Sequence, residues 1–251
     1  MKCPGQDSRF WKPGAIFEAQ CPQCGANVEF FKDDTARNCP SCDHRFVNPE
    51  MDFGCASYCQ FAEQCLGSLP PEIVAQQREL LKEKVAMAMR RVFGKDHRRI
   101  RHATRVAEYA ERLGKEENAD MAVVIISAYL HDIGIPEAER KYGSASPENQ
   151  HLEGPPMARR ILEALGTEPE LVDRVCDIVG RHHHPGSKES VEFKAVYDAD
   201  RIVNLQERLE ESGDLEPERL GSQLEQSCLT ASGINLGKEV LGVRGEQAAG
   251  P

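Results

Sequence analysis

The chain has 251 residues, of which 40% are hydrophobic and 29% charged, so it can bury a core in one large or two smaller domains and is neither fibrous nor disordered. Its formal net charge of −10 argues against broad binding to nucleic-acid phosphates in the absence of a local basic patch. No apolar run is long enough to span a membrane, since the longest, 121–130, is interrupted by Ser127. The amino-terminal sequence MKCPGQDSRFWKPG lacks the apolar segment of a signal peptide, so we expect a cytoplasmic protein.

The ten cysteines divide the chain into two chemically different parts. Because thiols stay reduced in the cytoplasm, metal coordination explains so many cysteines better than disulfides do. All but Cys176 and Cys228 lie in the first 65 residues, where the only candidate strands are short, as over 27–31. A segment so small and rich in loops cannot be stabilised by core burial alone. We therefore predict that metal holds it together.

Two CxxC pairs, Cys21-Pro-Gln-Cys24 and Cys39-Pro-Ser-Cys42, are separated by fourteen residues. Each pair can present two thiolates from one turn, and two such turns give the tetrahedral S4 coordination that suits zinc. The arrangement resembles the zinc-ribbon or rubredoxin-like knuckle family, although Asp43 stands where glycine is usual. The alternatives are four unligated buried cysteines or a thioredoxin-like redox pair, and no βαβ pattern supports the latter.

Cys55, Cys59 and Cys65 form a second cluster, for which Cys3 is the candidate fourth ligand. Four thiolates satisfy either a further zinc ion or a [4Fe-4S] cluster, and the spacing alone does not choose between them. The alternative is that some of these cysteines pack as small hydrophobic side chains. Closed sites made only of thiolates are structural or redox-sensing, because a hydrolytic metal needs an open position.

The composition changes at Leu69-Pro70-Pro71-Glu72, where the prolines and the acidic residue are typical of the start of a helix. We predict a mainly α protein, with a Cys-rich metal-binding β and loop domain over 1–68, an all-helical bundle over 69–244 and a disordered tail over 245–251. Apolar periodicity and turn residues predict helices over 72–93, 96–113, 118–131, 155–165, 170–179 and 193–211, and weaker ones over 217–229 and 236–241. We expect loops over 136–153 and 185–192.

The helix over 118–131 is apolar nearly all round, which marks it as the centre of the bundle, and it ends in His131-Asp132-Ile133-Gly134. An ionisable pair at the end of such a helix is costly unless it is paired or coordinated, so coordination of a metal is the economical explanation.

This segment resembles the HD superfamily of metal-dependent phosphohydrolases in its HDIG form. The family has a lone His, the His-Asp pair, further His residues in binuclear members and a final Asp. The resemblance covers 96–210, and the chain offers these residue types in that order at His102, His131, Asp132, His151, His182, His183 and Asp200.

The resemblance implies that the basic metal set is His102, His131, Asp132 and Asp200, with His131 and Asp132 at the catalytic centre and Asp132 between two ions. It implies further that two residues, His151 and His182, supply the additional ligands of a binuclear centre.

Several neighbouring residues are ambiguous. His183 and His184 adjoin His182, and Asp198 competes with Asp200. Singly, each histidine could be a surface residue and each aspartate a helix cap; the order of the set favours the metal centre.

Nitrogen and carboxylate ligands suit Mn, Fe, Co, Ni or Zn. Such ions lower the pKa of bound water and neutralise charge on a phosphoryl group. The resemblance therefore predicts hydrolysis of a phosphoester, in a nucleotide or a related small phosphorylated metabolite, by a metal-bound water. Arg105 and Lys141 are candidate phosphate ligands, although either can equally be a solvated charge on a helix face.

Two other functions stay open. Some members of the wider HD superfamily use a di-iron centre to activate oxygen, which would make the protein an oxygenase. Alternatively, the Cys-rich domain senses redox state or metal supply, or binds a protein partner, and the helical domain is a regulatory module.

Overall fold

The computed structural model describes residues 16–31, 34, 36–50, 71–212 and 217–243. The chain divides into two compact units, Met1–Leu80 and Leu81–Pro251, which are considered separately. The predicted second cysteine cluster and the predicted tail over 245–251 lie outside the described residues. The fold is mainly helical with a small β region at the Cys-rich end, so the predicted fold class is confirmed.

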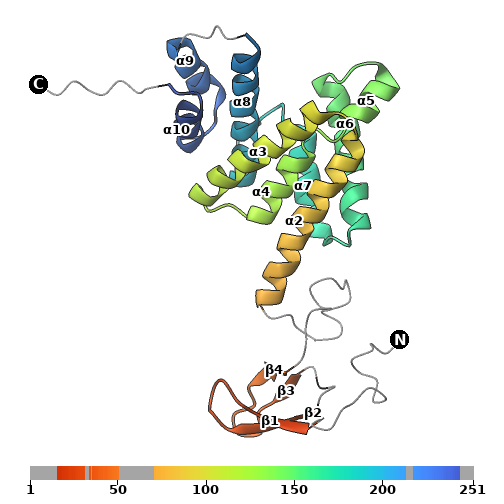
Figure 1. Ribbon diagram of the computed structural model, residues 1–251, viewed down its shortest axis with the longest axis vertical. Helices are drawn as coiled ribbons and strands as arrows, with labels where there is room; N and C mark the ends of the chain where they lie inside the picture. Colours follow the sequence, from red (N-terminus) through yellow and green to blue (C-terminus); the bar gives the residue numbers. More distant parts are fainter. Residues whose placement is uncertain (1–15, 32–33, 35, 51–70, 213–216, 244–251) are drawn as a thin grey trace, which may run out of the picture. The chain divides into compact units, whose positions relative to one another are not determined.

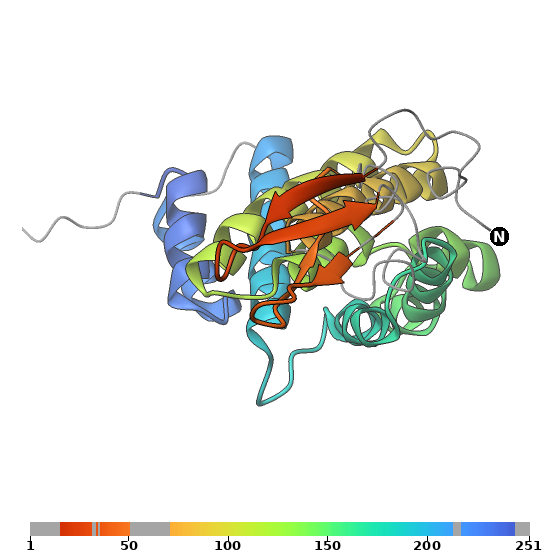
Figure 2. The ribbon, with the colours of Figure 1, turned by 90° about the horizontal axis from the view of Figure 1, so that it is seen from below.

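The first unit contains two antiparallel hairpins (Figure 2). One pairs β1 (Ile16–Gln20) with β2 (Asn27–Phe31), which confirms the predicted strand, and the other pairs β3 (Ala36–Asn38) with β4 (Arg45–Val47). Phe30 is fully buried, with the ring of Phe17 stacked on it and that of Phe46 edge-on. The small apolar cluster also contains two of the metal-type cysteines, so the core and the cysteine site are one structure.

The second unit is a bundle of helices (Figure 1), and the division between the two units along the chain falls within α2. In chain order the helices are α2 (Pro71–Phe93), α3 (His97–Glu116), α4 (Met121–Leu130), α5 (Ile135–Tyr142), α6 (Pro147–Ala164), α7 (Pro169–Arg181), α8 (Val191–Ser212), α9 (Pro217–Ser227) and α10 (Ala231–Val240). All eight predicted helices are present, with shifted ends.

The predicted loop over 136–153 was wrong, because this segment forms α5 and the first part of α6. Pro147 occupies the first turn of α6, where its missing N–H costs nothing, and Ser146 caps the helix by accepting a hydrogen bond from the amide of Asn149. The predicted helix start at Pro155 was therefore also wrong, since Pro155 and Pro156 lie inside α6.

Nearly every residue of α4 is buried, as its apolar composition predicts. Val123 and Val124 pack in a cluster with α3 and α8, whereas Ile126 and Leu130 pack in a second cluster with α2, α6 and α7. This helix therefore joins the two halves of the core, and its carboxyl end fixes the position of the residues that follow.

Among the described residues, one helical stretch, Met121–Tyr142, is long and apolar enough to cross a membrane. It is longer than the apolar run 121–130 of the sequence because it includes the turn over 131–134 and α5. The stretch is 72% buried within the structure, and this burial in the core accounts for its composition.

Candidate metal centres

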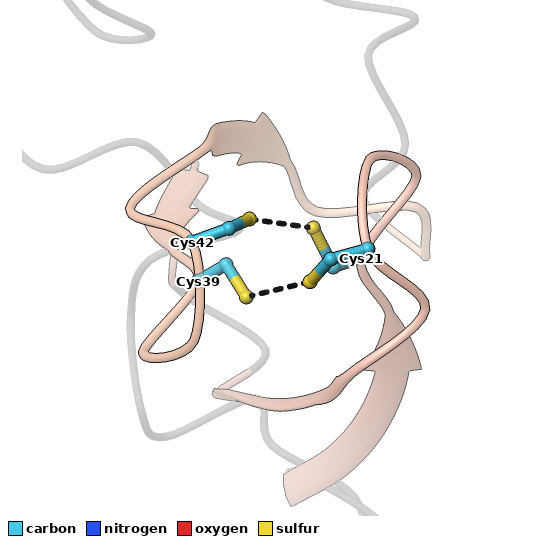
Figure 3. Close-up of side chains that lie close together, drawn as sticks. Cys21, Cys39 and Cys42 are labelled. Carbon is cyan, nitrogen blue, oxygen red and sulfur yellow. Dashed lines mark hydrogen bonds between the residues drawn. The ribbon is translucent and has the colours of Figure 1, made fainter.

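The four cysteines of the first unit come from two knuckles of the same design (Figure 3). In the first knuckle the amide of Gly25 donates to the carbonyl of Cys21, and in the second the amide of Asp43 donates to that of Cys39, both at 2.9 Å. Gly25 and Asp43 both have positive φ, 73° and 57°. Asp43 thus performs the glycine's role, because aspartate tolerates this left-handed conformation better than most residues.

The sulfur atoms lie at the spacing expected for one tetrahedral ion. Cys21 Sγ is 3.7 Å from Cys42 Sγ, and Cys24 Sγ is 3.6 Å from Cys39 Sγ. A tetrahedral ion with bonds of about 2.3 Å to sulfur separates its ligands by about 3.8 Å. Burial opposes ionisation, but hydrogen bonds from the amides of Ser41 and Cys42 and from neighbouring thiols lower the pKa of Cys39 to about 7, which favours a thiolate there. The amide of His44 acts in the same direction on Cys42, but burial and the neighbouring thiols outweigh it and raise the pKa of Cys42 to about 12, so its proton would have to leave when a metal binds. The residues of this site therefore fit a metal such as zinc.

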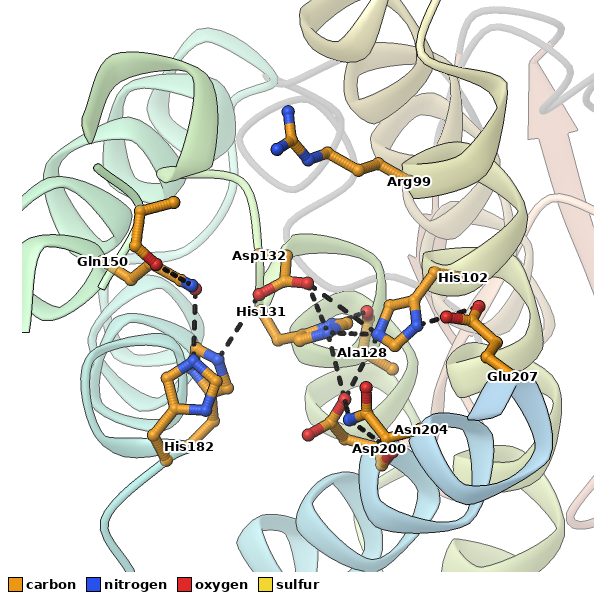
Figure 4. Close-up of polar contacts among 12 residues, drawn as sticks. Arg99, His102, Ala128, His131, Asp132, Gln150, His182, Asp200, Asn204 and Glu207 are labelled. Carbon is orange, nitrogen blue, oxygen red and sulfur yellow. Dashed lines mark hydrogen bonds and ion pairs between the residues drawn. The ribbon is translucent and has the colours of Figure 1, made fainter. Parts of the chain in front are cut away.

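The second centre lies in the helical unit, where residues from four helices converge (Figure 4). His102 comes from α3, Asp200 from α8, His131 ends α4 and His182 ends α7. Asp132 follows in the turn after α4. The side chains of His131 and Asp200 are 1% and 4% exposed, whereas that of Asp132 keeps 17%. The centre is therefore accessible from the side of Asp132.

Three acceptor atoms face one another in the first half of this centre. His102 Nε2 lies 3.2 Å from both His131 Nε2 and Asp200 Oδ1. The other ring nitrogen of His131 faces the carbonyl of Ala128 at 2.8 Å, and that of His102 faces a carboxylate oxygen of Glu207 at 3.2 Å. When the two imidazoles are neutral, these outer contacts take their N–H groups and leave lone pairs on both Nε2 atoms. Three converging lone pairs fit a bound cation.

Asp132 connects this group with a second one formed by Asp132, His182 and His183. Its carboxylate lies 3.3 Å from His131 Nε2 through one oxygen and 3.6 Å from His182 Nε2 through the other. His182 Nε2 is buried and has no hydrogen-bond partner among the described residues, while its Nδ1 faces the carbonyl of Val179 at 2.8 Å. A buried acceptor without a partner is the arrangement that a metal ion would satisfy.

Burial and neighbouring charged groups shift the pKa values of several residues in the centre. Burial lowers the pKa of His131, but Asp132 and Asp200 outweigh it and raise that pKa to about 9. Burial also opposes the charge on Asp200, yet its hydrogen bond with His102 lowers its pKa to about 2. Both carboxylates therefore stay ionised and require a proton or a metal ion beside them. Burial lowers the pKa of His183 to about 4, which keeps this imidazole neutral and able to coordinate.

Gly134 holds the turn that carries His131 and Asp132 against α6. A Cβ atom on Gly134 would lie 2.5 Å from the backbone nitrogen of Gly154 and 2.7 Å from its Cα. Only glycine permits this approach of two backbones. The glycine of the HDIG sequence therefore sets the position of the His-Asp pair relative to α6.

The other predicted site residues lie outside the two groups. His151 is exposed, and its Nδ1 contacts the carbonyl of Gly180, so its role as a ligand stays a prediction. Arg105 pairs with Glu210 at 3.0 Å and Lys141 with Glu153 at 2.7 Å, so phosphate would have to compete with carboxylates for either.

Asp198 is occupied elsewhere in the fold. Its carboxylate accepts hydrogen bonds from the amides of Leu229 and Thr230 ahead of α10. Asp200, not Asp198, lies in the centre.

Three supporting residues of the centre were not predicted from the sequence. Glu207 contacts His102 Nδ1, Asn204 donates to Asp200 Oδ1 at 2.7 Å, and Gln150 Oε1 lies 3.2 Å from His183 Nε2. Asn204 follows Asp200 by one helical turn, which is a signal available from spacing alone. The other two contacts join residues 105 and 33 positions apart in the chain and leave no local pattern.

The family model described as the HD domain matches residues 99–205, which include His102, His131, Asp132, His182 and Asp200. A structure of a predicted HD superfamily hydrolase from an uncultured Thermotogales bacterium is 24% identical, with 64% of this chain and 91% of that chain covered and a TM-score of 0.43. The structure of Bacillus subtilis YpgQ is 20% identical, with 67% of this chain and 94% of YpgQ covered and a TM-score of 0.45. The structure of YpgQ in complex with ADP is 21% identical, with 66% of this chain and 90% of YpgQ covered and a TM-score of 0.48. No curated protein matches the chain. The predicted resemblance to the HD superfamily is confirmed.

Proposed function

We propose that this HD-domain protein is a metal-dependent phosphohydrolase that cleaves a phosphoester of a nucleotide or a related small phosphorylated metabolite. The observation that carries the proposal is the convergence of unshared lone pairs from His102, His131 and Asp200 beside a partly exposed carboxylate, Asp132. A closed structural site would have no such exposed position.

We propose that the centre binds two ions, which is the number that the family order predicts. His102, His131 and Asp200 would hold the first, and His182 with His183 the second, with Asp132 between them. Bound divalent ions would lower the pKa of a coordinated water and neutralise charge on the phosphoryl group. The mixture of imidazole and carboxylate ligands favours Mn, Fe, Co, Ni or Zn over Mg.

The protein's own residues would orient these ligands. The carbonyls of Ala128 and Val179 fix the rings of His131 and His182, and Glu207 fixes that of His102, so each histidine presents Nε2 to the centre. Asp132 keeps 17% of its side chain exposed, which supports its role beside the reacting phosphate.

We propose further that Cys21, Cys24, Cys39 and Cys42 bind a structural zinc ion, on the strength of their sulfur spacing. The sensing and partner-binding roles considered for the Cys-rich region stay predictions, and the second cysteine cluster that would test the sensing role lies outside the described residues.

The test is release of phosphate or nucleoside from mono-, di-, tri- and cyclic nucleotides, with protein purified without oxygen and supplied with Mn, Co, Ni or Mg. We expect turnover that requires metal and is abolished by Asp132→Ala. Turnover that persists in Asp132→Ala would contradict the proposal. Absence of turnover together with bound iron and oxygen consumption would favour the oxygenase instead.

A further inference from the structure

Six cationic side chains gather where α2 turns into α3. They lie within 90–101, where the only acidic residue is Asp96, although the whole chain has 41 acidic and 31 basic residues. The six are Arg90, Arg91, Lys95, Arg98, Arg99 and Arg101. This segment, 90–101, is called the basic corner below.

The basic corner presents its charges to solvent. Arg90 and Arg91 lie in the last turn of α2, and the chain then turns at Gly94, whose amide donates to the carbonyl of Arg90 at 2.9 Å. Phe93 is buried on the core side of this turn. The exposed cations of the corner are Arg90, Arg91, Lys95, Arg98 and Arg101.

Most of these charges are not neutralised by the protein. Arg98 pairs with Glu211 at 2.8 Å, and Arg99 pairs with Glu139. In the rest of the helical unit, most cations likewise lie within ion-pair distance of a carboxylate. Four cations of the corner have no ion pair with any described residue, namely Arg90, Arg91, Lys95 and Arg101. An acidic chain therefore carries one local patch of uncompensated positive charge.

The basic corner continues into the helix that carries a ligand of the proposed metal centre. Arg99 precedes His102 by one turn of α3, and Figure 4 shows its side chain on the side of Asp132, where the centre is open. The distance along the helix axis from Arg98 to His102 is about 6 Å, so the positive charges begin beside the centre.

These features favour a partner with several phosphates in a row. Such a polymer would place one phosphate at the centre and others along the corner. Phe93 is the one phenylalanine, tyrosine or tryptophan of the segment, and its burial leaves phosphates rather than stacked bases as the groups to be bound. The side chains of His131 and Asp200 are nearly buried, so a phosphoester within a duplex cannot reach them, whereas the end of a flexible strand can.

We propose that the basic corner binds the phosphates of a single-stranded nucleic acid, and that the phosphoester hydrolysed at the centre is the terminal phosphate of that strand. The first part stands independently of any reaction, and the second rests on the proposed function. Binding confined to this corner agrees with the net charge of −10, which opposes contact with nucleic acid over the rest of the surface.

Binding is tested first, in the full chain carrying Asp132→Ala so that the strand is not cleaved. The probe is a fluorescein-labelled deoxythymidine strand of about 12 nucleotides, and its anisotropy is followed from about 50 to 200 mM salt. We expect binding that weakens steeply with salt, because each phosphate contact contributes about 0.7 to the slope of log affinity against log salt. Absence of binding at about 50 mM salt would overturn the proposal.

Replacing three of the unpaired cations tests whether the corner is the surface that binds. Arg90→Gln, Arg91→Gln and Lys95→Gln together should weaken binding roughly tenfold or more and reduce the salt slope by about 2.

The matched control removes three exposed cations that lie apart from one another and likewise have no ion pair with a described residue. Arg160→Gln, Lys188→Gln and Arg219→Gln together change the net charge equally and should leave the affinity within about twofold. Equal losses in the two triple variants would show that diffuse charge binds the strand, and would overturn the proposal.

A variant that conserves charge separates electrostatics from folding. Arg90→Lys, Arg91→Lys and Lys95→Arg together should bind the strand within about threefold of the chain with the unmodified corner, because every charge is kept. Binding as weak as in the Gln variant would mean that the charges of the corner do not explain the affinity, and would overturn the proposal.

A competing polymer separates phosphate from carboxylate. Poly-glutamate of similar length should displace the labelled strand at least roughly tenfold less well than the unlabelled strand does. Equal displacement would identify the corner as a surface for an acidic protein and would overturn its assignment to nucleic acid.

The substrate is tested with Asp132 intact and Mn supplied. Hydrolysis of the terminal phosphate adds water across its P–O bond, releases inorganic phosphate and leaves a hydroxyl group on the strand. For a strand with a 5′ or 3′ terminal phosphate, we expect the triple Gln variant of the corner to lower kcat/KM about tenfold. For thymidine monophosphate, kcat/KM should stay within about twofold.

An equal loss with both substrates would overturn the second part of the proposal, because the corner would then act on the centre and not on the strand. If no substrate is hydrolysed, the proposed function fails while the anisotropy titration still reports on the basic corner, so the two proposals fail separately.

Discussion

The two candidate metal centres of this chain are built in opposite ways. The cysteine site takes its ligands from two adjacent knuckles within 21–42, and each knuckle has the same backbone hydrogen bonds. The histidine and aspartate centre takes its ligands from 102–200, and four helices must pack correctly before they meet. A local site needs its metal to hold a small fold together, whereas a distributed site is held by the fold and can keep an accessible face. The first arrangement suits structure and the second suits chemistry.

The largest effect should come from removing one cysteine ligand. Structural zinc contributes about 10–16 kcal/mol of apparent binding free energy, far more than the small cluster around Phe30 can supply. We expect Cys39→Ser to lose the ion and unfold the hairpins, seen as loss of bound zinc and of amide dispersion in NMR spectra, while the helical unit keeps its thermal midpoint. Cys228→Ser, outside the cluster, should retain the zinc. Folded hairpins in Cys39→Ser would contradict a structural metal.

In the helical unit, a backbone change away from the ligands should disturb the distributed centre. Gly134→Ala forces the turn away from Gly154 and should cost about 1–3 kcal/mol of unfolding free energy. Because it displaces the His-Asp pair, it should also reduce turnover by about 10²-fold. Gly221→Ala is the control, since its Cβ would meet Val243 at an ordinary 3.5 Å. Denaturant unfolding and steady-state rates measure the two effects, and a stable, fully active Gly134→Ala would refute the role of this contact.

Glu207→Gln tests whether a side chain outside the ligand set tunes the centre. It replaces the carboxylate that orients His102 with a neutral amide, and such partners typically contribute 10- to 100-fold in metal affinity. We expect that loss in an Mn titration, with the thermal midpoint of the metal-free chain little changed. Glu210→Gln removes a surface partner of Arg105 and should have no effect on the affinity. Equal affinities in the two variants would show that Glu207 is not a positioning residue.

The difference between a local site and one distributed over several helices also explains which residues could be predicted from the sequence. Each CxxC pair is a local pattern, so the grouping of Cys21, Cys24, Cys39 and Cys42 at one site was predictable from spacing. The order of His102, His131, Asp132 and Asp200 was recognisable because motifs mark each position. Glu207 contacts His102 across 105 residues, and that contact depends on how α3 packs on α8, which no local pattern encodes.

The first turn of α6 was misread for a different reason. Pro147 and Ser146 are helix-start signals, but the segment around them is rich in small and polar residues and resembles a loop. Pro155, taken as a helix start, lies within the helix instead.

Metal binding at the helical centre should depend on pH in a defined direction. In the metal-free chain the pKa of His131 is raised to about 9, so its imidazole carries a proton at pH 7.5 that an ion must displace. Mn affinity should therefore rise with pH by up to about tenfold per unit and level off above pH 9. Calorimetry in buffers of different ionisation enthalpy should detect the released proton. Mn is the suitable probe because thiolates bind it poorly, and no proton release at pH 7.5 would contradict this charge state.

We expect the smallest effect from replacing Asp43, which stands in the second knuckle where the first has Gly25. Asp43 holds a left-handed conformation that glycine adopts without strain, but glycine also loses more chain entropy on folding and would forgo the hydrogen bond from Asn38. We expect the relief of backbone strain to exceed the loss of chain entropy and of the hydrogen bond, so that Asp43→Gly stabilises the zinc-bound fold by roughly 0.5 kcal/mol. Zinc retention against a competing chelator measures this, since binding and folding are coupled here. Gly25→Asp should weaken retention by a similar amount, because the first knuckle has the same backbone hydrogen bonds. If Asp43→Gly retained zinc less well than the unmodified chain, the Asn38 contact would outweigh the backbone strain, and the two knuckles would be alike in shape but not in what stabilises them.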